Sequence, residues 1–317
     1  VSQCSEDDWR DLLNSAIQRE ARFQGDMQVE VLSANDDSRQ QIKDIERFIA
    51  QRKDLIIVAP NVAEDVRPVI EKAYDSGIPV ILIDRRIKGS KYTAFIGANN
   101  TDIGRQIGEF VCLKYKGRSA NIIELRGLKG SSPEEERHEG FMSQISKPAS
   151  QLSIIGDCFC DWNEKEAQLA MDSLLKVHPK IDIVFAHNDR MALGAYNAIK
   201  AAGREKDIHI IGVDALLLDG GGVDMVMQRK MLATFIYPTG GSEAIILAKQ
   251  ILQKKDYKKE MELPAALVDE DNARVMKLQY KTMCQQEEKY KKMEKLTDRQ
   301  LEKINRQEII LFGTILL

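Results

Sequence analysis

Three apolar runs of this sequence end abruptly in polar side chains that are suited to hydrogen bonding. These are His187-Asn188-Asp189 after residues 183–186, Asp84-Arg85 after residues 80–83, and Asp214 after residues 208–213. An amide donates and accepts hydrogen bonds at once, and a charged partner strengthens a hydrogen bond to a hydroxyl group. These residue types therefore predict a site for a ligand that carries several uncharged hydroxyl groups. Asp189 is also placed to cap the next helix, and a plain turn with a cap is the alternative explanation of that motif.

Arg137 and two tryptophans add to this set. Arg137 lies in the helical stretch EEERHEGF, after a loop over residues 127–132. Trp9 and Trp162 are the only tryptophans of the chain, and each lies where a predicted strand leads into a predicted helix. An aromatic face covers the C–H face of a sugar ring at low entropic cost. We therefore expect Trp9 and Trp162, at corresponding places in the two halves of the chain, to flank the ring of the ligand.

The elements that must position these residues alternate regularly. Strands are predicted for residues 29–32, 55–59, 80–83, 95–97, 122–125, 154–155, 183–186 and 208–213, and helices for stretches that include 8–24, 38–52, 62–76, 102–115, 162–177 and 189–202. Such alternation predicts an α/β fold with a parallel sheet covered on both faces. In such sheets ligands bind at the carboxyl ends of the strands, which is where the polar side chains lie.

The sequence holds more strands than one modest sheet needs, and its two halves are similar. We therefore expect two Rossmann-like lobes that face each other across a cleft and are joined by short hinge crossings. The N-terminal lobe is expected to comprise residues 1–98 and 239–266, and the C-terminal lobe residues 99–238 and 267–275.

Four runs carry a resemblance to a known family: GIPVILIDR (77–85), ERHEGF (136–141), VFAHNDRMALGA (184–195) and IIGVD (210–214). With these motifs the chain resembles the type I periplasmic sugar-binding proteins of the ribose- and galactose-binding group, over roughly residues 1–275. The resemblance implies that sugar hydroxyls are bound by Asp84, Arg85, Arg137, Asn188 and Asp214, that Trp9 and Trp162 are the aromatic contacts, and that Gln3 and Asp7 are polar residues of the first loop.

The sequence departs from the ribose pattern at two places. A second stacking aromatic of that pattern falls on Arg10, so a cation is expected to replace part of the stacking. The usual glutamine near the third hinge strand falls on or beside Pro238, with Tyr237 and Thr239 as substitutes. The resemblance therefore implies a sugar other than ribose.

The character of the chain changes at about residue 273, where a long, highly charged helical stretch begins. It leads to the apolar run EIILFGTILL (308–317), which is too short to cross a bilayer. We expect a juxtamembrane helix over residues 276–307 and the start of a transmembrane segment over 308–317, with a C-terminal helix docked on the domain as the alternative. Met276 begins a weak repeat of seven residues, for which a coiled coil and a solvated stalk are equally good explanations. Both ends of the sequence are expected to continue in a longer protein.

A sugar-binding module followed by such a helix resembles the sensor portion of hybrid two-component histidine kinases, and most closely the fructose-responsive members. The resemblance implies a periplasmic domain of an inner-membrane protein that binds a hexose, with fructose as the expected sugar and a homodimer as one option. The alternatives are the soluble sugar-binding protein of an ABC transporter and the effector-binding domain of a lac-type repressor, which shares the fold.

Composition excludes several other classes of function. The 317 residues carry a net charge of −3 and no basic patch interleaved with aromatics, so no nucleic acid is expected as a partner. The five cysteines and four histidines have no metal-site spacing, and we expect no metal and no cofactor. An enzyme is not expected either: a glycosidase needs one protonated carboxyl group, and Arg85 should keep Asp84 ionised. The run Asp219-Gly220-Gly221-Gly222 lacks the lysine of a phosphate-binding loop.

Overall fold

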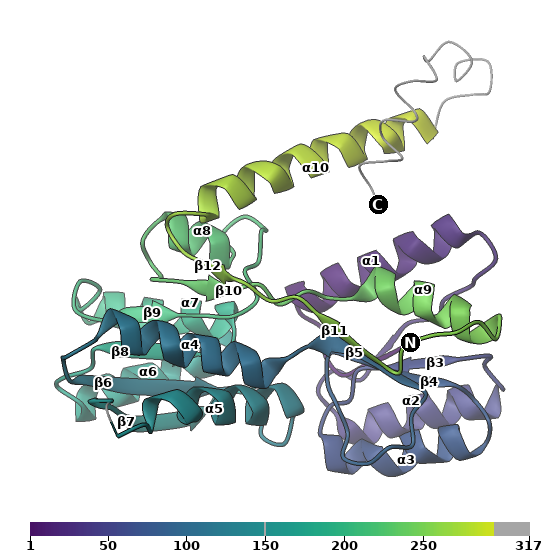
Figure 1. The fold of residues 1–317 in the computed structure, drawn as a ribbon, viewed down its shortest axis with the longest axis horizontal. Coiled ribbons are helices and arrows are strands. Elements are labelled where there is room, and N and C mark those ends of the chain that lie inside the picture. The colour runs from purple at the N-terminus through teal and green to yellow at the C-terminus, as the bar shows by residue number, and fades with distance from the viewer. Residues whose placement is uncertain (149, 295–317) are drawn as a thin grey trace.

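The computed structural model describes residues 1–148 and 150–294, and it divides most of their strands between two parallel sheets (Figure 1). Within these residues the first sheet has the strand order β11-β5-β4-β3-β1-β2 and the second has the order β7-β6-β8-β9. Neighbouring strands of both sheets pair in parallel. The predicted α/β fold with two Rossmann-like lobes is confirmed.

The strands are short, and most coincide with the apolar runs of the sequence. The first sheet contains β1 (Ser2–Gln3), β2 (Leu32–Ser33), β3 (Ile56–Val58), β4 (Val80–Ile83), β5 (Ala94–Ala98) and β11 (Glu260–Leu263). The second contains β6 (Ala120–Arg126), β7 (Leu152–Phe159), β8 (Ile183–Ala186) and β9 (His209–Ile211). The strand predicted at 29–32 was wrong in its position, because pairing with β1 begins at Leu32, whose N–H donates to the carbonyl of Val1 at 2.9 Å.

Helices cover both faces of the first sheet. Helices α1 (Asp8–Gln24) and α9 (Gly241–Leu252) cover one face, and α2 (Ser38–Ala50) and α3 (Ala63–Asp75) cover the other. Side chains alternate between the faces of a strand. Ile81 and Ile83 of β4 therefore pack with α1 and α9, whereas Val80 and Leu82 pack with α2 and α3.

The second sheet is covered in the same way, by α4 (Asn100–Lys114) and α5 (Ser132–Ile145) on one face and by α6 (Glu164–Val177) and α7 (Asp189–Ala201) on the other. Helices α4 and α5 approach so closely that a Cβ atom on Gly104 would lie 2.1 Å from the carbonyl oxygen of Arg137. A Cβ atom on Gly140 would lie 2.0 Å from the carbonyl oxygen of Thr101. These two glycines therefore fix the position of α5, the helix that carries Arg137.

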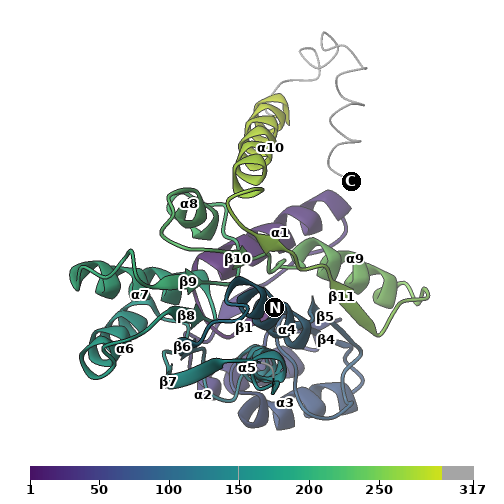
Figure 2. The same ribbon diagram turned by 60° about the vertical axis from the view of Figure 1, so that its left-hand side comes forward.

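The chain passes between the lobes where β5 leads to α4, where β10 (Thr234–Phe235) leads to α9, and where β11 leads to β12 (Leu267–Val268). Strands β10 and β12 pair antiparallel near the short helix α8 (Gly222–Met227). Helix α10 (Ala273–Glu294) then extends away from the lobes beside α8 (Figures 1 and 2). This confirms the helix predicted from about residue 273.

The end of the predicted juxtamembrane helix and the predicted transmembrane start at 308–317 lie outside the described residues. Among the residues that the structure does describe, no helix combines the length and the apolar character needed to cross a membrane.

Candidate functional site

A cleft between the two lobes brings together nine of the ten residues predicted to bind the ligand. The volume of this cleft, including the part that is open to solvent, is about 510 Å³. The predicted residues that line it are Asp7, Trp9, Arg10, Asp84, Arg85, Arg137, Trp162, Asn188 and Asp214. The tenth, Gln3, is buried in β1, where its side-chain amide donates to Asn14 at 2.8 Å, and it does not line the cleft. Its placement gives no support to a role in ligand binding.

Asp84 is the centre of the N-terminal side of the cleft. It follows β4 with a φ of 67°, in the left-handed region, and its side chain is buried. Its carboxylate forms an ion pair with Arg10, lies 3.6 Å from Nε of Arg85, and accepts a 2.6 Å hydrogen bond from the hydroxyl of Tyr237. Burial alone would raise the pKa of Asp84, but the two guanidinium groups and the hydroxyl outweigh it and lower the pKa below the usual value. Asp84 is therefore ionised, as predicted, although Arg10 is a closer partner than Arg85.

Arg137 lies where residues of three separate segments meet. Its Nη1 donates to the carbonyl of His187, and its Nε donates to the side-chain oxygen of Asn100 at 2.9 Å. Its guanidinium group lies over the ring of Tyr237, 4.5 Å from the centroid, and 5.6 Å from the centroid of Trp162. Cation–π contacts of this kind hold the planar group in one orientation. Arg137 is therefore already positioned to donate to a ligand in the cleft.

The structure corrects the helix cap predicted at Asp189. The N-cap of α7 is Asn188, whose Oδ1 accepts from the N–H of Met191 at 2.8 Å, while its Nδ2 donates to the carbonyl of Trp162 at 3.2 Å. Asp189 is the first residue of the helix, and its carboxylate is buried and accepts from the hydroxyl of Thr234 at 2.7 Å. An amide caps as well as a carboxylate does. Asn188 thus both caps α7 and lines the cleft.

Both tryptophans line the cleft, but they are not at equivalent places. The indole of Trp9 packs on Tyr237, with ring centroids 5.4 Å apart. Trp162 follows β7, the edge strand of the second sheet, and Asp161 and Trp162 have φ values of 47° and 65°. The corresponding edge strand of the first sheet is β2, and the residues after it, Asn35 and Asp36, have φ values of 49° and 64°. Trp162 therefore corresponds to Asp36, and the predicted equivalence with Trp9 was wrong.

Asp214 is the acidic residue on the C-terminal side of the cleft. It follows β9 with a φ of 119° and is half-buried. Burial, together with the nearby carboxylate of Asp189, raises the pKa of Asp214 well above its usual value. Asp214 lines the cleft, where its carboxyl oxygens can accept hydrogen bonds from a neutral hydroxyl group.

The structure adds cleft residues that the sequence did not single out. They are Asp8, Pro133, Arg190 and Leu216, together with Tyr237, which was expected only as a substitute contact. Arg190 of α7 forms an ion pair with Asp8 of α1 and so joins the two lobes at the mouth of the cleft. On the other side, the N–H of Arg86 donates to the hydroxyl of Ser132 at 2.7 Å. Such contacts between lobes depend on the tertiary structure and leave no local pattern in the sequence.

A buried carboxylate supports the cleft from behind. Glu124 of β6 is fully buried and lies between two histidines, 2.8 Å from Nδ1 of His138 and 2.9 Å from Nε2 of His187. Burial raises the pKa of Glu124, but the hydrogen bonds and charges of the two histidines outweigh burial and lower it to about 2. The hydrogen bond to Glu124 raises the pKa of His138, whereas burial lowers the pKa of His187.

Glu124→Gln should make stability less dependent on pH. Because the pKa of Glu124 is lower in the folded state, its contribution is complete above the ordinary value of 4.5 and is lost as the pH falls toward about 2. This contribution is on the order of 3 kcal/mol in the free energy of unfolding. The raised pKa of His138 acts in the opposite sense, since its contribution is lost as the pH rises above its ordinary value of 6.5.

The measurement is urea denaturation from pH 2.5 to pH 8.5, with Glu135→Gln on the exposed side of α5 as the matched control. Glu124→Gln should be less stable than the parent at neutral pH and should lose both pH-dependent contributions. If its stability changed with pH as steeply as that of the parent, the assignment to Glu124 would be wrong.

A second prediction concerns Gly127, which allows the indole of Trp162 to lie in the cleft. A Cβ atom on Gly127 would lie 2.1 Å from Cη2 of Trp162. Gly127→Ala should therefore displace the ring and weaken ligand binding by about tenfold, since an aromatic contact contributes about 0.5–1.5 kcal/mol. In a Trp162→Leu background the same substitution should have no further effect on affinity. Equal losses in both backgrounds, measured by calorimetry, would show that Gly127 acts by another route.

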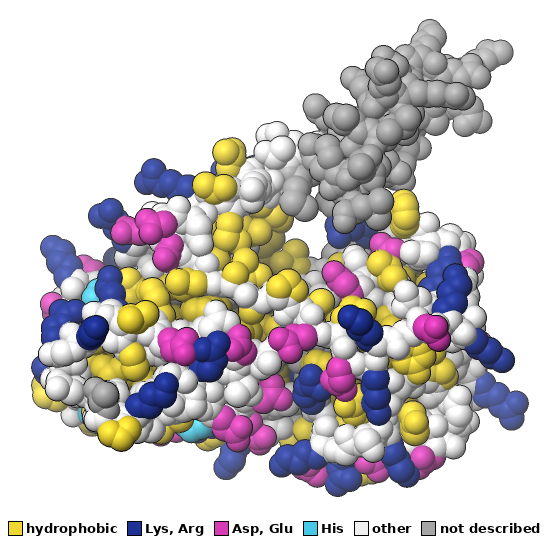
Figure 3. Space-filling model, viewed as in Figure 1, with side chains coloured by type: hydrophobic (Ala, Val, Ile, Leu, Met, Phe, Trp, Pro, Cys, Tyr) yellow, Lys and Arg dark blue, Asp and Glu magenta, His cyan; other side chains and the backbone are white. Residues whose placement is uncertain are grey.

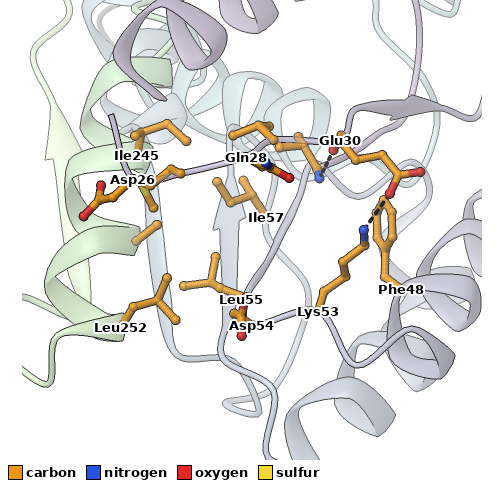
Figure 4. Close-up of a pocket in the computed structure, with 14 residues that line it drawn as sticks. Asp26, Gln28, Glu30, Phe48, Lys53, Asp54, Leu55, Ile57, Ile245 and Leu252 are labelled. Atoms are coloured by element: carbon orange, nitrogen blue, oxygen red, sulfur yellow. Dashed lines mark hydrogen bonds and ion pairs between the residues drawn. The ribbon is translucent and has the colours of Figure 1, made fainter. Parts of the chain in front are cut away.

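A larger cavity lies at the opposite, amino-terminal end of the first sheet (Figure 4). Its walls include Leu55, Ile57, Ile245 and Leu252, and Lys53 forms an ion pair with Glu30 at its rim at 2.7 Å. The carboxyl ends of the strands, where ligands bind in parallel α/β sheets, are at the other edge. The cleft between the lobes is therefore the candidate ligand site. Within residues 1–148 and 150–294 no cluster of three or more acidic, cysteine or histidine side chains is arranged to hold a metal ion.

Comparison with known proteins agrees with this geometry. Residues 1–256 match the family model of a periplasmic binding protein domain. The chain is 32% identical over 257 residues to the ribose import binding protein RbsB of Bacillus subtilis (strain 168), which covers 80% of this chain and 81% of that protein. It is 34% identical over 220 residues to the galactofuranose-binding protein YtfQ of Escherichia coli (strain K12), covering 67% and 69% of the two chains. A solved structure, the fructose binding periplasmic domain of hybrid two component system BT1754, matches with a TM-score of 0.90 and 46% identity over 92% of this chain and 97% of that one.

Proposed function

We propose, on the premise that this chain belongs to the type I periplasmic binding protein family, that its cleft binds one hexose and that the domain reports the bound sugar to a membrane-bound sensor kinase. Residues of both lobes line the cleft, so a sugar bound there would contact both of them. A hinged protein closes on such a ligand because the closed state offers more contacts than the open one.

The balance of charge in the cleft is the observation that carries this proposal. Four aspartates and four arginines line it: Asp7, Asp8, Asp84 and Asp214, and Arg10, Arg85, Arg137 and Arg190. Their formal charges cancel, which favours an uncharged ligand over a phosphorylated or carboxylated one. Several buried donors in the cleft have no partner among the described residues, namely Nε and Nη1 of Arg10 and Nε1 of Trp162. Sugar hydroxyls would satisfy them, and buried donors normally are satisfied.

Fructose is the proposed sugar because the structural neighbour with 46% identity is named for binding fructose. That neighbour is also the periplasmic domain of a hybrid two-component system, which supports the sensor role. The 22-residue helix α10 after the last strand would be the juxtamembrane helix of such a sensor. We further propose that residues 308–317 begin the segment that anchors the domain to the inner membrane, and that two copies can associate there.

The second candidate function is that of a soluble sugar-binding protein of an ABC transporter. The import and sugar-binding proteins among the relatives support this alternative. Catalysis is not proposed, because the carboxylate of Asp84 is already occupied by Arg10 and by the hydroxyl of Tyr237. A carboxylate held in this way is a poor nucleophile or base toward a bound sugar.

Titration calorimetry of the purified chain with a panel of neutral monosaccharides tests the proposal. D-Fructose should bind with a Kd in the micromolar range, roughly −8 kcal/mol. Fructose 6-phosphate should not bind, because the balanced cleft has no surplus positive charge for the phosphate. Tighter binding of an aldose such as ribose than of fructose would favour the second candidate function, that of a soluble binding protein of an ABC transporter. The absence of heat with every neutral sugar would overturn the proposal.

A further inference from the structure

Lys277 of α10 is a buried cation that lies outside the cleft. Its side chain is 7% exposed. Its Nζ donates to the carbonyl oxygens of Leu217, at 2.7 Å, and Leu218, at 3.3 Å, and forms an ion pair with Asp224 at 3.0 Å. Asp219 is a further partner at 3.2 Å, but its side chain is fully exposed and contributes little. A buried lysine with this set of partners fixes the first turns of α10 on the residues that precede it.

The backbone that Lys277 holds continues directly into the cleft. We call residues 214–224, which end in the first turn of α8, the ligand loop. It begins with Asp214 and Leu216, which line the cleft, and continues through Leu217 and Leu218 to Asp224. Asp214 would bind sugar hydroxyls, and Leu216 would contact the sugar beside it. Leu216 is thus the direct sequence neighbour of Leu217, whose carbonyl Lys277 binds.

The ligand loop is also held from the side of the sheet, so a shift at one end is passed to the other. The N–H of Leu216 donates to the carboxylate of Asp189 at 3.1 Å, and the N–H of Val223 donates to the carbonyl of Leu216 at 3.2 Å. Gly222 packs directly on Asp189, since a Cβ atom there would lie 1.8 Å from its Oδ2. Because the hydrogen bond between Val223 and Leu216 closes the loop and Gly222 packs on Asp189, we expect the loop to move as one unit.

Helix α10 follows β12 in the chain and is attached to this loop by Lys277. It rises beside α8 and away from both lobes (Figures 1 and 2). Figure 3 shows acidic and basic side chains interspersed over the lobes on this face, so no field of one sign attracts the helix. The first turns of α10 are therefore held by local packing and by the contacts of Lys277.

We infer that Lys277 is the positioning residue that couples sugar in the cleft to helix α10, through the carbonyl groups of the ligand loop. This inference rests on the proposed function, because it requires that a sugar binds at Asp214 and Leu216. Sugar contacts at Asp214 and Leu216 would restrict the motion of the ligand loop further, and the restricted loop would hold Lys277 and the first turns of α10 more firmly. The coupling is reciprocal, so a firmly held α10 also raises the affinity for sugar.

Amide hydrogen exchange of the full chain, with and without saturating D-fructose, tests the inference. In the parent, sugar should slow exchange in residues 273–282 by about fivefold or more, the lower end of ordinary coupling between sites. Lys277→Met, which keeps the aliphatic stem and removes the cation, should abolish this response and weaken sugar affinity by a similar factor. Lys281→Met makes the same change one turn further along α10, at an exposed position, and should behave as the parent.

Asp224→Asn removes the same ion pair from the side of the ligand loop. It is a control for the possibility that Lys277→Met weakens α10 in general. It should reduce the response in residues 273–282 while the ligand loop itself still responds to sugar. If sugar binds by calorimetry but α10 does not respond in the parent, or responds equally in Lys277→Met, the inference fails and the proposed function stands. If the parent binds no neutral sugar at all, the proposed function fails and the inference fails with it.

Discussion

Asp84→Asn is expected to lower the free energy of unfolding by about 3–5 kcal/mol, the usual effect of removing one partner of a buried ion pair. The guanidinium group of Arg10 is buried beside Asp84 and would keep its charge without a counterion. Asparagine has nearly the same shape and tolerates the left-handed backbone at this position, so the loss reports on charge and not on strain. Urea denaturation at pH 7 measures the effect.

A double-mutant cycle separates the ion pair from other effects of the substitution. Arg10→Met should also destabilise the fold, because it leaves the carboxylate of Asp84 with fewer partners. The double variant should be more stable than the sum of the two single losses predicts, since neither buried charge is then left alone. Additive losses would contradict a direct interaction between Arg10 and Asp84.

Asp214→Ala is expected to weaken sugar binding by about 2–4 kcal/mol, or roughly 30- to 1,000-fold in Kd. The substitution removes the carboxyl oxygens that would accept hydrogen bonds and leaves sugar hydroxyls unpaired in a closed cleft. Asp214→Asn should lose less, because the amide keeps an acceptor oxygen in place. Titration calorimetry with the sugar identified from the panel gives both values.

Asp207→Ala is the matched control, since Asp207 is exposed and lies just before the amino end of the same strand, β9. It should bind sugar as the parent does. The assignment of Asp214 to the ligand would be contradicted by an Asp214→Ala variant whose affinity equals that of the control.

Local patterns were sufficient to predict the architecture and most of the cleft. Val80–Ile83 and Ile183–Ala186 are strands because they are short, apolar and β-branched runs, and the residues that follow them must lie at the carboxyl edge of a parallel sheet. The same logic placed Asp84, Arg85 and Asn188 around one cleft. Arg137 and the two tryptophans were added from the chemistry of their side chains, and the family resemblance implies the same roles for them.

The remaining features depend on which segments meet in three dimensions. Tyr237 lies on a crossing between the lobes, and its hydroxyl reaches Asp84 from 153 residues away. Arg190 is a cleft residue only because α7 faces α1 across the mouth of the cleft. Gln3 lies outside the cleft because β1 directs its side chain toward Asn14, in α1. Asn188 and Asp189 are both good N-cap residues, so residue preference does not tell which of them is the cap. Backbone geometry decides between them, and it shifts the helix start by one residue.

Tryptophan fluorescence tests the central claim, that a monosaccharide binds in the cleft between the lobes, most directly. Trp9 and Trp162 are the only tryptophans of the chain, and both line that cleft. Titration with D-fructose should change the emission to saturation with one Kd, equal to that from calorimetry, and Trp9→Phe and Trp162→Phe should each lose part of the change. Emission that stays constant while calorimetry shows the sugar binding would place the ligand elsewhere and contradict the account.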